Sequence, residues 1–151
     1  MAEETRIEAI LDFAIEREQE AVDFYTEMAG KVKSPAMQDV FKQFAQEERG
    51  HQAKLRGVKT GRTTLVSKGT VPHLALGDYL VAEAAGPEIS YQDALILAMK
   101  REKAAYRLYT DLAGQVGDAE VRNLLLTLAQ EEAKHKLRFE VEYDENILTE
   151  N

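Results

Sequence analysis

The sequence predicts an all-α protein: a four-helix bundle built from two duplicated helix pairs that are joined by a long crossover. Two observations carry this prediction. Apolar residues recur at helical spacing over most of the 151 residues, and positions 14–55 align without a gap on positions 98–139. Internal similarity at a fixed offset indicates a repeated structural unit. The length suits a single domain over 1–151 with a substantial buried core.

The first helix pair is expected over 5–57. Its first helix should begin at Thr5, because Thr5 and Glu8 have the spacing of a capping box. Ser34 precedes Pro35, the order typical of an N-cap residue followed by proline at the first helical position. The second helix of the pair is therefore expected to begin there and to end at a glycine.

The second helix pair is expected over 90–148, with Ser90 and Asp118 as the N-caps of its two helices. Between the pairs lies a linker, 58–89, which has a loop-like composition except for a predicted short helix over 74–84. A bundle helix of about 24 residues is roughly 36 Å long. A linker of this size can cross the whole bundle, which favours one long crossover over a simple up-down-up-down order.

The bulk composition excludes several classes of function. The net charge is −8 with no run of basic residues, which argues against binding nucleic acid or an anionic membrane. The chain has no cysteine, so disulfides, zinc–thiolate sites, iron–sulfur clusters and thiol catalysis are excluded. The N-terminus is unlike a signal peptide, and no apolar run is long enough for a membrane span. A cytoplasmic protein is expected.

Polar residues interrupt the apolar stripe of every predicted helix at corresponding positions. Each helix places one glutamate on its buried face, and the second and fourth helices add a histidine three residues later. Burying an unpaired charge costs several kcal/mol, so these groups need partners. The residues concerned are Glu18, Glu48, His51, Glu102, Glu132 and His135.

A pair of metal ions is the partner that this pattern predicts. Residues three apart on a helix are neighbours, so each Glu-x-x-His unit can reach one ion. Four buried carboxylates would repel one another strongly, and two divalent cations would neutralise them. The carboxylates are expected to bridge the two ions, with one imidazole serving each ion. Four carboxylates and two imidazoles form the ligand set of di-iron and di-manganese bundles, and iron and manganese both accept it.

Other residues near this site have simpler interpretations. Tyr25 and Tyr109 lie two turns after Glu18 and Glu102 on the same face, either as core aromatics or as phenols that hydrogen-bond to ligand carboxylates of a facing helix. The glutamates that precede the motif glutamates are expected to face solvent; they are Glu47 and Glu131. In the linker, His73 has no second ligand at metal spacing and is expected not to bind metal.

These motifs resemble the ferritin-like superfamily, and within it the rubrerythrin-like proteins. The residues that carry the resemblance are Glu18 with Tyr25, Glu48 to His51, Glu102 with Tyr109, and Glu132 to His135. The resemblance covers most of the chain. It implies a non-haem di-iron centre and a homodimer or larger homo-oligomer. Members of this group reduce hydrogen peroxide, react with dioxygen or oxidise ferrous iron.

The sequence departs from rubrerythrins proper in two respects. They usually carry a rubredoxin domain with four cysteines, which this sequence lacks, and an extra carboxylate one turn after the third-helix glutamate. Here that position is Ala105, and its counterpart in the first copy is Ala21. The extra carboxylate is associated with the peroxidases of the family, so its absence keeps simpler ferroxidase chemistry open.

The function expected from the sequence is a di-iron oxidoreductase in which two ferrous ions reduce hydrogen peroxide or dioxygen in oxidative-stress defence. Re-reduction requires an external electron donor such as a rubredoxin or a flavoprotein. The main alternative is a ferroxidase for iron storage or handling. An oxygen-activating hydroxylase acting on an organic substrate and a non-enzymatic bundle with an empty site are the two further alternatives.

Overall fold

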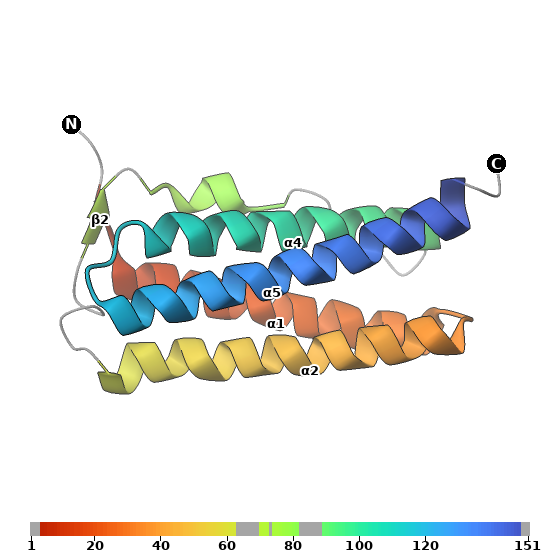
Figure 1. Ribbon diagram of the computed structural model, residues 1–151, viewed down its shortest axis with the longest axis horizontal. Helices are drawn as coiled ribbons and strands as arrows, with labels where there is room; N and C mark the ends of the chain where they lie inside the picture. The colour runs from red at the N-terminus through yellow and green to blue at the C-terminus, as the bar shows by residue number, and fades with distance from the viewer. Residues whose placement is uncertain (1–3, 63–69, 73, 82–88, 149–151) are drawn as a thin grey trace.

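Four long helices lie side by side along one axis in the part of the chain that the structure, a computed structural model, describes (Figure 1). The described residues are 4–62, 70–72, 74–81 and 89–148. The helices are α1 (Ile7–Lys31), α2 (Pro35–Gly57), α4 (Tyr91–Ala113) and α5 (Ala119–Tyr143). The predicted four-helix bundle of two helix pairs with a long crossover is confirmed.

The crossover returns the chain along the outside of α4, so α2 and α4 run in the same direction (Figure 1). Its described parts are a π-helical turn, η1 (Val58–Arg62), a short strand, β2 (Thr70–Pro72), and a 3₁₀ turn, η2 (Leu76–Tyr79). The helix predicted over 74–84 is reduced to this single 3₁₀ turn within the described residues, because Leu80 has extended backbone angles. Residues 82–88 and His73 lie outside the described part.

A two-stranded antiparallel pairing closes one end of the bundle and was not predicted from the sequence. Strand β1 (Glu4–Arg6) pairs with β2, with Thr5 opposite Val71. This pairing corrects the predicted capping box, because Thr5 belongs to β1 and the N-cap residue of α1 is Arg6, which makes no side-chain cap bond. The π-helical turn η3 (Asp144–Leu148) extends α5.

The other predicted N-caps are present in the structure. The Ser34 hydroxyl accepts a hydrogen bond from the Met37 N–H at 3.3 Å, and the Ser90 hydroxyl accepts one from Asp93 at 3.1 Å. Asp118 accepts one from the Val121 N–H at 3.0 Å. Each of these bonds satisfies an N–H group that has no partner within its own helix.

The apolar core consists of two clusters that are separated along the bundle axis. One cluster, near the paired strands, contains the start of α1 and the end of α2, including Ile10 and Leu55. The other, near the α1–α2 turn, contains Phe41, Phe139 and the ring of Tyr25. The polar residues singled out in the sequence lie between the two clusters on every helix. The bundle therefore surrounds a polar layer with apolar packing on both sides.

Candidate metal centre

All six residues predicted to bind metal are brought together in this polar layer. Each is at most 2 % exposed, because each lies on the buried stripe of its helix. They form two groups, within each of which one ligand atom per residue lies within 4.8 Å of the others. The first group is Glu18, Glu48, His51 and Glu132; the second is Glu48, Glu102, Glu132 and His135. Because both groups share Glu48 and Glu132, the arrangement suits a bridged pair of ions.

The Nδ1 atoms of both imidazoles face the carboxylates. His51 Nδ1 lies 3.0 Å from Glu18 Oε2, 2.8 Å from Glu132 Oε1 and 3.4 Å from Glu48 Oε1. His135 Nδ1 lies 3.2 Å from Glu48 Oε1 and 3.5 Å from Glu102 Oε2. One Nδ1 atom carries at most one proton, so it cannot satisfy several converging oxygens. Convergence of this kind is what a shared cation requires.

Three carboxyl groups of the cluster have raised pKa values. Burial, followed by the charge of Glu48, raises the pKa of Glu18 well above its usual value. Burial, followed by the charge of Glu102, does the same to the pKa of Glu132, and burial also raises the pKa of Glu102. Without cations, these groups therefore tend to retain protons. Divalent ions would displace the protons and relieve the repulsion.

The pKa values of the two histidines and of Glu48 are shifted in the direction that favours their charged forms. Burial alone would lower the pKa of each histidine, but the carboxylate oxygens close to each ring and their negative charge outweigh it. The pKa of His51 is raised to about 9, mainly through Glu18, and that of His135 to about 11, mainly through Glu102. Burial opposes ionisation of Glu48 too, yet close contacts with His135 and Glu132 and the positive charge of both histidines lower its pKa.

Buried polar atoms without a well-aligned hydrogen bond provide a test of whether these residues fit a metal pair. Among the described residues, those in this cluster are both carboxylate oxygens of Glu48, one oxygen each of Glu102 and Glu132, and both ring nitrogens of His135. Buried polar atoms in folded proteins almost always have partners. All of these atom types are good ligands for divalent iron or manganese. The cluster therefore fits a di-metal site.

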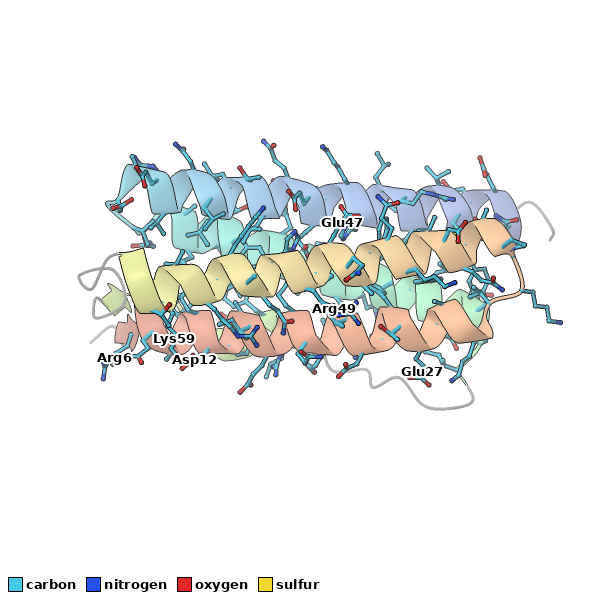
Figure 2. The ribbon with its side chains drawn as sticks, turned by 90° about the horizontal axis from the view of Figure 1, so that it is seen from below. Arg6, Asp12, Glu27, Glu47, Arg49 and Lys59 are labelled. Atoms are coloured by element: carbon cyan, nitrogen blue, oxygen red, sulfur yellow. The ribbon has the colours of Figure 1, made fainter. Side chains whose placement is uncertain are left out.

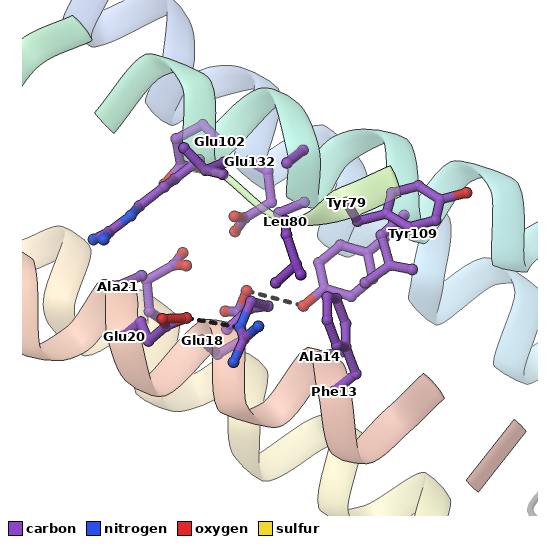
Figure 3. A pocket seen from close by; sticks show the side chains of 17 residues that line it. Phe13, Ala14, Glu18, Glu20, Ala21, Tyr79, Leu80, Glu102, Tyr109 and Glu132 are labelled. Atoms are coloured by element: carbon purple, nitrogen blue, oxygen red, sulfur yellow. Dashed lines mark hydrogen bonds and ion pairs between the residues drawn. The ribbon is translucent and has the colours of Figure 1, made fainter. Parts of the chain in front are cut away.

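The two tyrosines cross the bundle to carboxylates of the opposite helix pair. The Tyr109 hydroxyl of α4 donates to Glu18 Oε1 of α1 at 2.9 Å (Figure 3). The Tyr25 hydroxyl of α1 donates to Glu102 Oε1 of α4. The sequence left two interpretations of these tyrosines open: core aromatics, or phenols that hydrogen-bond to carboxylates of a facing helix. The structure contains the hydrogen bonds of the second interpretation. Each phenol leaves one oxygen of its carboxylate for another partner and holds that carboxylate in position.

Glu47 and Glu131 do not simply face solvent, and the prediction that they do is wrong. Their side chains are 37 % and 30 % exposed, and each contacts the histidine of the other motif. Glu131 hydrogen-bonds to His51 Nε2, and Glu47 Oε1 lies 3.5 Å from His135 Nε2. Figure 2 shows Glu47 between α2 and α5. A step of about 100° around a helix still allows a long glutamate to reach the adjacent helix.

The hydrogen bond between His51 and Glu131 indicates which nitrogen of His51 is available to a metal. Glu47 places a carboxylate near the same nitrogen of His135 without a hydrogen bond. A carboxylate at Nε2 favours the tautomer with the proton on Nε2 and leaves the Nδ1 lone pair directed at the cluster. Sequence reasoning missed this role, although one signal was present. Both motif copies contain a doubled glutamate, Gln46 to Glu48 and Gln130 to Glu132, and solvent exposure alone gives no reason for that repetition.

Replacing Glu131 by alanine is expected to weaken metal binding roughly 10–100-fold, because the His51 ring loses its orienting acceptor. Titration of the metal-free protein with Co²⁺, followed by absorbance, measures this. Glu131→Gln keeps an acceptor oxygen and should recover part of the affinity. The control, Glu140→Ala, removes a carboxylate of the same helix that pairs with Lys136. Equal Co²⁺ affinity in Glu131→Ala and this control would contradict the assigned role.

The fold and the cluster together define a ferritin-like protein of the di-metal carboxylate class. The rubrerythrin family model matches residues 9–143, and the chain belongs to the rubrerythrin family.

Two solved structures resemble the chain. One, described as a ferritin-like diiron-carboxylate protein from Thermotoga maritima, has a TM-score of 0.84 at 18% identity over 97% of this chain and 99% of that chain. The other, a hypothetical protein from Pyrococcus furiosus, has a TM-score of 0.69 at 29% identity over 91% of this chain and 88% of that chain. No curated protein matches the sequence. Within the described residues, no helix is long and apolar enough to span a bilayer.

Proposed function

We propose that this protein is a non-haem di-iron oxidoreductase that reduces hydrogen peroxide or dioxygen, with electrons from an external donor. The observation that carries the proposal is the shared pair of carboxylates, Glu48 and Glu132, between two groups that each contain one imidazole. A bridged pair of redox-active ions suits a two-electron reduction of one small oxidant. When bound, the two iron ions would supply these electrons.

The side chains of the chain have separate tasks in this proposal. Glu18 and Glu102 would each hold one ion, while Glu48 and Glu132 would keep the two ions close together. Tyr25 fixes the orientation of Glu102 by its hydrogen bond from the facing helix, as Tyr109 does for Glu18. The two apolar clusters on either side of the polar layer limit the access of bulk water.

Iron is the preferred metal because the chain belongs to the rubrerythrin family, although manganese fits the same ligand set. The electron donor is proposed to be a rubredoxin or a flavoprotein, since a sequence without cysteine has no thiolate-bound iron centre of its own. Assembly into a homodimer or larger homo-oligomer is also proposed from the family resemblance. The substrate is a small molecule rather than a nucleic acid or a membrane.

One observation favours a second candidate, a ferroxidase that serves iron storage or handling. The position of the extra carboxylate found in rubrerythrin peroxidases is Ala105, whose side chain and that of Ala21 border a cavity instead of contributing a ligand. A centre without this ligand has fewer carboxylates to stabilise alternative metal positions. Accumulation of an iron mineral in a larger assembly would support this candidate over the peroxidase.

Rapid mixing of the anaerobic, ferrous-loaded protein with peroxide, and separately with dioxygen, distinguishes the oxidants. We expect faster oxidation by peroxide, followed as absorbance of the oxidised centre, and repeated turnover when a reduced rubredoxin is supplied. A preference for dioxygen with one turnover and iron accumulation would favour the ferroxidase. Failure to retain two metal ions per chain would contradict both and indicate a bundle with an empty site.

A further inference from the structure

Helix α5 has apolar residues on two opposite sides, and only one of these sides faces the core. On the buried side, Leu125 and Leu128 are 0 % exposed. On the opposite side, Leu126, Leu137 and Val141 are 40 %, 60 % and 39 % exposed. Figure 2 shows side chains of α5 that point away from the other three helices. The outer face of α5 is defined here as the strip of residues spaced three or four apart: Leu126, Gln130, Ala133, Leu137 and Val141.

The internal repeat indicates that the bundle itself does not require an apolar strip at this place. Helix α2 packs against α1 as α5 packs against α4. In the alignment of 14–55 with 98–139, Leu126, Ala133 and Leu137 correspond to Lys42, Arg49 and Ala53, which are all exposed on α2. Charged or small residues therefore suffice at these positions of a bundle helix. Apolar residues in their place mark a surface that contacts another molecule.

A surface hollow beside the outer face adds to this surface. It lies between α4 and α5, has a volume of about 300 Å³ and is bordered by Tyr106 and Ala133. Tyr106 is 41 % exposed and contributes an aromatic side chain from α4. The edge of the hollow is charged, because Lys136 and Glu140 pair there at 2.9 Å. An apolar centre with a charged edge is the usual composition of a protein–protein interface.

The charges along α5 favour an antiparallel copy of the same helix as the partner. Arg122 lies a turn before Leu126, and Asp144 lies a turn after Val141, at equal distances along the chain from Ala133. A two-fold axis near Ala133 therefore sets Arg122 of each copy opposite Asp144 of the other. It also sets Leu126 opposite Val141. A parallel pair would place like charges together, whereas the antiparallel pair also aligns the two helix dipoles favourably.

We propose that the outer face of α5 binds the same face of a second copy of this chain across a two-fold axis. This inference rests on the proposed function, whose homo-oligomer it makes specific. Ala133 has a short side chain at the centre, so the two helices can approach closely there. The face and Tyr106 supply fewer residues than the roughly 20–30 per side of a standard interface, so we expect a dissociation constant on the order of 10 µM.

Sedimentation equilibrium of the metal-loaded full chain, from about 1 to 200 µM, measures this dissociation constant. We expect Leu137→Glu to weaken the dimer roughly tenfold or more, because a two-fold contact carries each substitution twice. The control is Ala53→Glu, at the corresponding exposed position of α2, which should leave the dimer unchanged. Both positions are exposed, so both variants should keep the fold.

An exchange of charges tests the antiparallel arrangement. Arg122→Glu should weaken the dimer several-fold, because it places a carboxylate opposite Asp144 of the second copy. Arg122→Glu combined with Asp144→Arg exchanges the two signs and should restore the wild-type dissociation constant. Both substitutions suit the dipole of α5, since they put an acidic residue near its start and a basic residue near its end. Failure of the double variant to restore the dimer overturns the proposal.

The outcomes separate this interface from the homo-oligomer of the proposed function. A dimer that is equally strong in Leu137→Glu and Ala53→Glu overturns the interface and leaves the homo-oligomer intact. A wild type that stays monomeric up to about 200 µM overturns both and would leave the outer face to a different protein. Metal content and peroxide oxidation of the iron form test the rest of the proposed function separately.

Discussion

Glu48→Ala is expected to lose both metal ions, whereas Glu18→Ala is expected to lose only one. Glu48 belongs to both ligand groups, and Glu18 belongs only to the group that contains His51. Removing a shared carboxylate leaves each ion with one ligand fewer. Once an ion is lost, the remaining carboxylates repel one another because no cation neutralises them. Metal analysis after anaerobic iron loading should therefore give two ions per chain in the wild type, about one in Glu18→Ala and none in Glu48→Ala.

Two controls separate loss of ligands from loss of fold. Glu48→Gln keeps the volume of the side chain but removes its charge, so it should fold and still fail to hold the metal pair. Glu27→Ala removes an exposed carboxylate of α1 that pairs with Lys31, and it should retain two ions. Equal metal contents in Glu18→Ala and Glu48→Ala would argue against a bridging position for Glu48. Retention of both ions in Glu48→Ala would rule out Glu48 as a shared ligand of the two ions.

Metal removal should destabilise the protein strongly. At free metal about 1,000-fold above the dissociation constant, binding to the folded state adds about 4 kcal/mol to the free energy of unfolding. For a chain of this size that corresponds to a rise in Tm of roughly 8–16 °C. Thermal unfolding with and without Fe²⁺ under anaerobic conditions, followed by circular dichroism, measures the difference. A shift of less than about 2 °C would contradict tight binding at the cluster.

The stability of the metal-free protein should depend on pH in a direction that follows from the pKa shifts in the cluster. Glu18, Glu102 and Glu132 have folded-state pKa values raised above the ordinary 4.5, so they disfavour the folded state increasingly as pH rises above that value. His51 and His135 have pKa values raised to about 9 and about 11. Their stabilising effect is complete below about 6.5 and is lost as pH rises through the raised values.

Both effects lower the stability of the metal-free protein as the pH increases from about 5 to 9. Glu48 acts in the opposite direction, because its lowered pKa gives a stabilising effect that is lost in acid. Protons compete with metal ions for the same ligands, so the metal-loaded protein should gain stability over part of this pH range. The difference in Tm between the two forms should therefore widen from pH 6 to pH 8. A constant difference would contradict the coupling of protons and metal.

The helix pairs and the six buried polar residues could be predicted because each depends on local periodicity. Ser34, Ser90 and Asp118 cap helices through bonds to residues three positions away, which a sequence records directly. A single Glu-x-x-His motif would have been ambiguous. The internal repeat predicted one site from the two motifs, because each of the four helices has a glutamate on its apolar stripe.

The paired strands could not be predicted in the same way. β1 and β2 are three-residue segments far apart in the sequence, and neither is long enough to show the alternation that marks a strand. Their pairing displaced the capping box expected at Thr5. A local motif was therefore overridden by a long-range backbone contact.

By itself, the sequence determined which residues are buried on each helix, since helical periodicity decides the face that leaves water. Only the tertiary structure decided which helix each buried or half-buried group meets. It directed Tyr25 and Tyr109 to carboxylates of the opposite helix pair, and Glu47 and Glu131 to each other's histidines. The physical reason is that the hydrophobic effect has no direction, so partners across the bundle follow from helix packing and side-chain reach rather than from spacing along the chain.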